Sequence, residues 1–439
     1  MIRHSVVTAR TVTLAIPAVL LLVLGVAPRA AAEPATPVSY PGAATATRLT
    51  GYAFDRCDAP SASAMKAWVG SRYRGVAIYI GGRNRTCDAQ PNLTPTWVVQ
   101  VAKNWRLIPI YLGHQAPCAD RRRDEHFTAT NAATKGTADA IAAVAAARAL
   151  GLLPGSALYG DMEHYDPADA GCRGAVLRYI SSWTKELHRV GYLSGMYVNL
   201  GSGAQHLDEA YSSTAYARPD AVWVARYDRV ASLTGWAGIP DSRWSNHQRA
   251  KQYWAERTET YGGVTMTIDS NRWDAPVATV AHSYTVTGTS PLNARRGPGT
   301  AYPVVTSYGP GTTLKIVCQT PGSTVGSTKV WDKLTSGAYV SDYYLSTPSQ
   351  TTYSAPVPRC KYPYQVTLSS LNERLGPSGS SAVKATLPAG ALAWVFCQTA
   401  GTKVYTTSVW DRLDDGYYVT DYYLATPSKT TYSRPIPRC

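Results

Sequence analysis

The chain has 439 residues, and its 43 Lys and Arg against 29 Asp and Glu give a formal net charge of +14. Such a basic balance favours an anionic partner. The eight cysteines, an even number, include no CxxC motif and no Cys/His pair at the spacing of zinc ligands, which excludes a zinc site of that kind and favours disulfides.

Residues 1–32 have the pattern of an export signal. Arg3 and Arg10 make a basic start, residues 11–27 form an apolar core, and Ala30, Ala31 and Ala32 follow as a small-residue cleavage site. The alternative is a membrane anchor, but the apolar run is shorter than the roughly 20 residues of a spanning helix. We therefore expect a secreted, wall-associated protein that begins near Glu33, with a linker over 33–48 and no integral membrane segment after cleavage.

Residues 49–280 alternate short apolar runs with amphipathic stretches, the pattern of parallel βα units. Helices are expected to begin at Pro60-Ser61 and at Thr94-Pro95. The fold class is thus α/β, a (β/α)8 TIM-type barrel. Its eight strands are expected at 51–54, 76–80, 107–112, 157–159, 193–198, 222–225, 250–253 and 264–268.

Four acidic residues fall at the expected carboxyl ends of these strands, where barrel enzymes carry their catalytic groups: Asp55, Asp161, Glu163 and Asp269. Residues i and i+2 of a strand point the same way, so Asp161 and Glu163 belong to one cluster. Crowded carboxylates raise one another's pKa, which lets one stay protonated as a general acid. The alternative is that each is a helix cap or a salt-bridge partner.

Several long motifs resemble the secreted actinobacterial domain described as glycoside-hydrolase-like, which is similar to family 25 lysozyme-type muramidases. They are GYAFDRCDAPSASAMKAW, VAIYIGGRNRTC, NWRLIPIYLGHQAPC, GDMEHY, VWVARYD, KQYW and TIDSNRWD. The resemblance implies that Glu163 is the general acid, with Asp161 beside it and Asp55 and Asp269 lining the same site. Candidate sugar-binding residues at other strand ends are Tyr111, Tyr197, Arg226, Gln252 and Tyr253.

The cysteines divide evenly between the two halves of the chain. The spacing of 42 residues recurs in Cys318 to Cys360 and Cys397 to Cys439, which predicts these two disulfides. In the first half we expect Cys57 with Cys87 and Cys118 with Cys172, because each pair would join loops after neighbouring strands on one rim.

The second half is a tandem repeat with an offset of 79 residues, visible as WDKL and WDRL and as DYYL and DYYL. Its short Val, Tyr and Thr runs predict two small all-β modules, at 282–360 and 361–439. They resemble the bacterial SH3-like domains of exported wall enzymes, which implies a tethering role. The repeats carry 14 Lys and Arg against 7 Asp and Glu, and 15 of the 30 tyrosines. For an exported chain this favours anionic wall polymers or a membrane surface before nucleic acid.

The leading hypothesis is a glycoside hydrolase that cleaves peptidoglycan or a related wall glycan. The alternatives are a non-catalytic wall- or carbohydrate-binding protein and, third, an interaction protein that uses the basic repeats. We expect no cofactor, because Gly201-Ser202-Gly203 lacks the third glycine of a dinucleotide loop, and no metal, because His164 has no second His at ligand spacing.

Overall fold

A computed structural model describes residues 44–120 and 125–439. The expected export signal at 1–32 and the linker up to residue 43 lie outside the described residues. Within the described part of the chain, no helix has both the length and the apolar character needed to cross a membrane.

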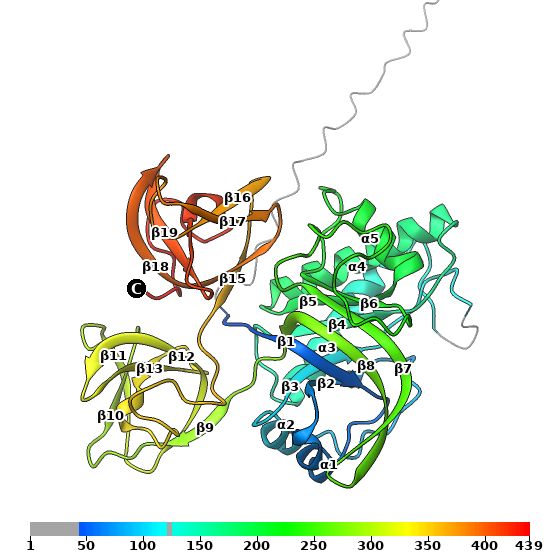
Figure 1. Ribbon diagram of the computed structural model, residues 1–439. Helices are drawn as coiled ribbons and strands as arrows, with labels where there is room; N and C mark the ends of the chain where they lie inside the picture. Colours follow the sequence, from blue (N-terminus) through cyan, green and yellow to red (C-terminus); the bar gives the residue numbers. More distant parts are fainter. Residues whose placement is uncertain (1–43, 121–124) are drawn as a thin grey trace, which may run out of the picture. The chain divides into compact units, whose positions relative to one another are not determined.

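Eight strands close into a barrel in the order of the sequence, which confirms the expected barrel (Figure 1). The first seven strands run parallel, but β8 pairs antiparallel with both β7 and β1. The expectation of eight parallel units is therefore wrong at the last strand. A turn at Gly262 and Gly263, both with positive φ, joins β7 to β8 in place of a helix. The strands are β1 Thr47–Asp55, β2 Tyr73–Gly81, β3 Arg106–Tyr111, β4 Ala157–Met162, β5 Leu193–Asn199, β6 Ala221–Ala225, β7 Arg249–Tyr261 and β8 Val264–Val277.

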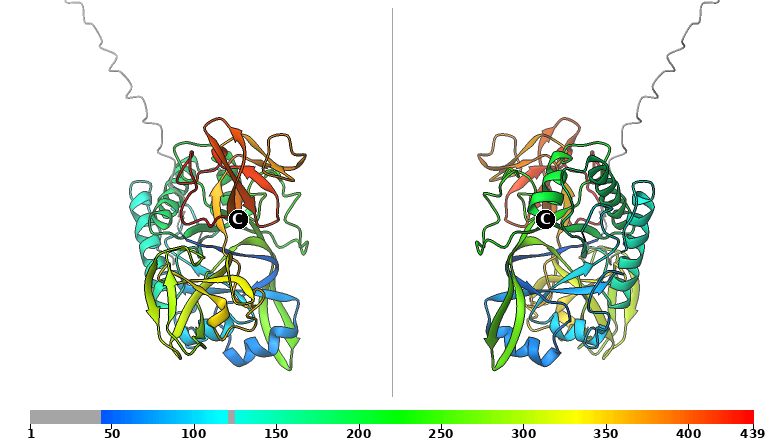
Figure 2. Two further views of the ribbon diagram at one scale, coloured as in Figure 1. Left: turned by 90° about the vertical axis from the view of Figure 1, so that its left-hand side faces the viewer. Right: turned by 90° about the vertical axis from the view of Figure 1, so that its right-hand side faces the viewer.

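The helices begin where side chains cap them. Ser61 accepts a hydrogen bond from Ala64 N at the start of α1, and Thr94 accepts one from Trp97 N at α2, where Pro95 occupies the first turn. Both expected helix starts are thus confirmed. The two long helices, α3 and α4, lie side by side on the outside of the barrel (Figure 2). The helices are α1 Ala62–Ala67, α2 Pro95–Val101, α3 Ala132–Ala149, α4 Ala170–Arg189 and α5 Gln205–Glu209, with a π-helical turn at Leu200–Ala204.

Large and small side chains fill the interior of the barrel. Trp223 and Trp273 contact one another at 5.2 Å between ring centroids, and Tyr159 packs against both. Ala53 and Ala77 on β1 and β2 leave room for these rings. Because the interior is packed, the functional groups of the barrel must lie beyond this layer, at one end of the strands.

The two repeats form two small all-β modules, as expected, and each contains a six-stranded sheet. The first contains β9 His282–Thr285, β10 Leu292–Arg295, β11 Val304–Tyr308, β12 Thr313–Val325, β13 Thr328–Leu334 and β14 Tyr339–Ser341. The second contains β15 Tyr362–Gln365, β16 Ser370–Arg374, β17 Val383–Pro388, β18 Leu392–Val404, β19 Thr407–Leu413 and β20 Tyr418–Thr420. Trp331 and Trp410, the tryptophans of the repeated WDKL and WDRL motifs, are buried in them.

All four expected disulfides are present: Cys57–Cys87, Cys118–Cys172, Cys318–Cys360 and Cys397–Cys439. Cys57–Cys87 joins two loops of the barrel, Cys118–Cys172 joins a loop to the first turn of α4, and each of the other two closes one module. Disulfides of this number are typical of a protein that folds in an oxidising compartment outside the cytosol.

Candidate active site

The four acidic residues lie at the same end of the barrel. Asp55 ends β1, Asp161 is the last but one residue of β4, and Glu163 follows that strand directly. Asp269 lies in the middle of β8 rather than at its end, because β8 continues to Val277. It still reaches this end of the barrel, since the antiparallel register pairs Asp269 with Asp55.

Gln252 of β7 connects two of these carboxylates. Its Nε2 donates to both oxygens of Asp55, at 3.0 and 2.9 Å, and to Oδ2 of Asp269 at 3.2 Å. Asn271 donates a further hydrogen bond to Asp55 Oδ1 at 2.6 Å. Two amides thus hold Asp55 in one orientation beside Asp269.

The buried position of Asp55 changes its protonation state. Burial, followed by the negative charge of Asp269, raises the pKa of Asp55 to about 8, although the amides of Asn271 and Gln252 oppose the shift. Burial also raises the pKa of Asp269. At neutral pH Asp55 therefore keeps its proton within this group of carboxylates.

The pKa values of nearby tyrosines are raised by burial and by the charges of these carboxylates, and Tyr79 is affected by three of them. Burial raises the pKa of Tyr79, and the charges of Asp161, Asp55 and Glu163 raise it further. The Tyr79 hydroxyl donates to Asp161 Oδ2 at 3.4 Å.

Tyr227 and Tyr197 complete this environment on the side of β5 and β6. Burial is the largest cause that raises the pKa of Tyr227, and the charges of Glu163, Asp269 and Asp55 add to it. The hydroxyls of Tyr227 and Tyr197 both donate to Gln252 Oε1, at 2.9 and 2.8 Å. We call the four carboxylates together with Tyr79, Tyr197, Tyr227, Gln252 and Asn271 the carboxylate cluster.

Gln115 fixes the strand end that carries Asp161 and Glu163. Its side chain is fully buried, with Nε2 donating to the Asp161 carbonyl at 2.8 Å. Its Oε1 accepts a hydrogen bond from Glu163 N at 2.9 Å. Because one amide holds the backbone on both sides of Met162, the direction of the Glu163 side chain is set by the barrel rather than by a free loop.

The structure brings some of the expected sugar-binding residues into the cluster and leaves others out. Tyr197 and Gln252 are members. Tyr111 is not, because its ring packs on Trp183 of α4 at 6.1 Å, and burial raises its pKa to about 12. Tyr253 accepts a hydrogen bond from Arg72 at 3.1 Å on another side of β7, and Arg226 pairs with Asp228 at 2.9 Å.

The alternation of side chains along a strand explains this division. Ile110, Ala225 and Gln252 point into the barrel, so Tyr111, Arg226 and Tyr253, one residue further on, point away. The same rule identifies members of the cluster that the motif comparison did not single out. Tyr79, Tyr227 and Asn271 each follow an inward residue by two positions, after Ala77, Ala225 and Asp269.

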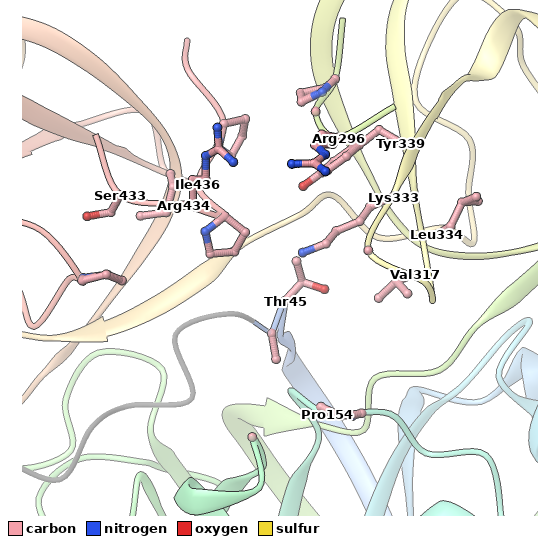
Figure 3. A pocket seen from close by; sticks show the side chains of 18 of the residues that line it. Thr45, Pro154, Arg296, Val317, Lys333, Leu334, Tyr339, Ser433, Arg434 and Ile436 are labelled. Carbon is pink, nitrogen blue, oxygen red and sulfur yellow. The ribbon is translucent and has the colours of Figure 1, made fainter. Parts of the chain in front are cut away.

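A second feature of the described residues does not have catalytic character. A cavity of about 1150 Å³ is lined by the basic groups of Arg296, Lys333 and Arg434 together with Thr45 and Pro154 (Figure 3). No carboxylate is among its lining residues in the described chain. We therefore place acid and base chemistry at the carboxylate cluster and not in this cavity.

The described residues bring together one group with the composition of a metal site, Cys57, Asp58 and Cys87. The disulfide between Cys57 and Cys87 occupies both sulfur atoms, so this group does not offer thiolate ligands.

Comparisons with known proteins found a matching family model and several similar solved structures. Residues 66–273 match the model of the Rv2525c-like, glycoside hydrolase-like domain family. A similar solved structure is the Tat-secreted protein Rv2525c of Mycobacterium tuberculosis in complex with L-tartrate, with 15% identity, a TM-score of 0.37, and coverage of 51% of this chain and 96% of that chain. Another is a family 25 glycosyl hydrolase from Bacillus anthracis, with 11% identity, a TM-score of 0.31, and coverage of 52% and 93%.

A curated relative is the uncharacterized protein YraI of Bacillus subtilis (strain 168), which is 36% identical over 99 residues that make up 19% of this chain and 81% of that protein. The matched family model spans most of the barrel and includes Asp161, Glu163 and Asp269. Residues 66–273 of this chain therefore resemble the Rv2525c-like, glycoside hydrolase-like domain family, whose model they match.

Proposed function

We propose that the barrel hydrolyses the glycan strand of peptidoglycan or of a related wall polysaccharide. Glu163 donates a proton to the leaving oxygen, and Asp161 beside it positions the sugar and stabilises positive charge that develops on the ring. Asp55 and Asp269 complete the site, with Tyr197 and Gln252 as hydrogen-bonding partners of the sugar.

The observation that carries this proposal is the gathering of four carboxylates around Tyr79 and Tyr227 at one end of the barrel. Glycosidic cleavage needs one protonated and one ionised carboxyl group at the same site.

The two modules, in this proposal, hold the secreted enzyme on the wall. Their net charge of +7 suits anionic wall polymers, and their many tyrosines offer flat apolar area with polar edges. Linked binding of this kind raises the local concentration of substrate at the barrel.

A pair of matched substitutions tests the catalytic role. Glu163→Gln keeps the shape of the side chain and removes its proton, so release of reducing sugar from purified peptidoglycan should fall at least about a hundredfold. The control is Glu209→Gln, since Glu209 is 57% exposed and pairs with Arg173 away from the cluster. Its activity should match that of the parent.

Two results would count against the proposal. If Glu163→Gln retains parental activity, Glu163 is not the acid. If the parent protein binds wall glycans and releases no reducing ends from any of them, the barrel is a carbohydrate-binding domain and not a hydrolase.

A further inference from the structure

The hairpin between β18 and β19 differs from its counterpart in the first module at one position. In the first module, Val325 pairs with Thr328 across a two-residue turn that begins with Gly326. In the second module, Val404 pairs with Thr407, and the equivalent residue is Tyr405.

Both turns need a left-handed backbone at this position. The φ angle is +56° at Gly326 and +49° at Tyr405. Glycine adopts this conformation freely, and it is the preferred first residue of such hairpin turns, whereas a bulky aromatic residue is strained there. Residues held in strained conformations concentrate at functional positions, so the tyrosine calls for a functional explanation.

The side chain of Tyr405 completes a group of three tyrosines. Its ring stacks on Tyr422 at 4.9 Å between centroids with 26° between the planes. Tyr423 meets these two rings edge-on, at 5.0 Å from Tyr422 and 6.2 Å from Tyr405. A hydrogen bond between the hydroxyls of Tyr405 and Tyr423 raises the pKa of Tyr423. We call these residues the tyrosine platform.

The platform faces solvent. Tyr405 is 69% exposed, more than any other large hydrophobic side chain of the described residues. Its neighbour in the turn, Thr406, is also exposed and adds a hydroxyl. Strain at the backbone and exposure of an aromatic ring both reduce stability or solubility, and neither is offset by burial in the module itself.

The first module has no such platform. A Cβ atom at Gly326 would lie only 2.5 Å from the ring of Tyr343, because that ring lies against the turn. The two modules therefore offer different surfaces at equivalent positions, although both keep the DYYL motif.

We propose that the tyrosine platform is a carbohydrate-binding site that stacks one pyranose ring of an N-acetylhexosamine polymer. The apolar C–H face of a sugar ring matches the exposed ring of Tyr405, and the tyrosine and threonine hydroxyls match the sugar hydroxyls at the edge. This proposal rests on the tethering role proposed above and makes it more specific, since it assigns glycan binding to one module.

Isothermal titration of the full chain with a soluble chitin oligosaccharide tests the site. Every protein carries Glu163→Gln so that no sugar is cleaved during the titration. Tyr405→Gly copies the turn of the first module, and it should lose one binding event while its thermal transition moves to higher temperature, because the strain is relieved. Tyr405→Trp should retain the binding event.

Leu375→Ala is the matched control, because Leu375 is 59% exposed on the same module and is also apolar. It should leave every binding event unchanged. The proposal is overturned if Tyr405→Gly binds the oligosaccharide with the same number of events and affinity as its parent, or if Leu375→Ala weakens binding equally. Neither outcome depends on whether the barrel hydrolyses glycan, which is measured separately by release of reducing ends.

Discussion

Asp55 is the residue of the carboxylate cluster whose protonation the barrel controls most directly. Its pKa of about 8 has two main causes, burial and the charge of Asp269. Infrared titration should therefore show a protonated carboxyl band that disappears with an apparent pKa near 8 and is absent from Asp55→Asn. Asp269→Asn removes the second cause, so it should move the titration to lower pH. A titration that Asp269→Asn leaves unchanged would contradict this account.

The four acidic residues could be found from the sequence because strand ends are marked by a change from apolar to polar residues. The partners of these carboxylates could not all be found in that way. The sequence analysis selected Tyr111 and Tyr253 and not Tyr79 and Tyr227. Choosing correctly requires knowing which side chains of each strand point into the barrel, and a shift of one residue reverses that assignment. Gln115 lies in a loop, and no periodic pattern indicates that its amide reaches the backbone of Glu163.

At the level of elements, the unexpected feature is the antiparallel β8. The expected βα alternation holds up to β6, but no helix of the described chain lies between β6 and β7, and the Gly-Gly turn after Tyr261 makes a hairpin and not a crossover. This arrangement matters to the site because the sequence pattern places Asp269 at the carboxyl end of a parallel strand, whereas β8 continues past it to Val277. The antiparallel register instead pairs Asp269 with Asp55.

Each module contains the same buried pair of carboxyl groups. Gln319 donates to Asp332 at 2.9 Å and to Asp342 at 3.0 Å. Gln398 makes the same two contacts with Asp411 and Asp421, at the same distances. Burial, followed by the charge of the partner, raises the pKa of Asp332 and Asp411 well above the ordinary value. Each pair is therefore expected to share a proton.

These pairs predict an unusual pH dependence of stability. A carboxyl group whose pKa is raised by folding binds its proton more tightly in the folded state. Its contribution to the free energy of unfolding is therefore complete below the unfolded pKa of about 3.9, and it is lost as the pH rises through the folded pKa. The Tm of the modules should therefore fall as pH rises above about 4. Asp421→Asn, which needs no proton, should reduce this slope in scanning calorimetry.

The matched control for that experiment is Asp415→Asn, since Asp415 is exposed on the same module. Its slope should equal that of the parent. A parent protein whose modules become more stable as pH rises would show that the two carboxyls do not share a proton.

At the scale of the whole molecule, the division of labour between barrel and modules predicts salt-dependent binding to walls. The full chain with Glu163→Gln should sediment with insoluble walls at low salt. Added salt should release much of it, because the modules carry a net charge of +7 and screening shortens the reach of exposed charges. If salt does not weaken the binding, the basic charge of the modules does not hold the protein on the wall. The glycan-binding role of the tyrosine platform is tested separately.

The central claim is that the barrel hydrolyses a glycosidic bond, and heavy-oxygen water tests it most directly. The parent protein is incubated with peptidoglycan in that water, and the products are examined by mass spectrometry. We predict new reducing ends that carry one heavy oxygen each, because water supplies the oxygen at the cleaved anomeric carbon. Wall glycan that stays intact, or is cleaved without uptake of the heavy oxygen, would contradict the claim.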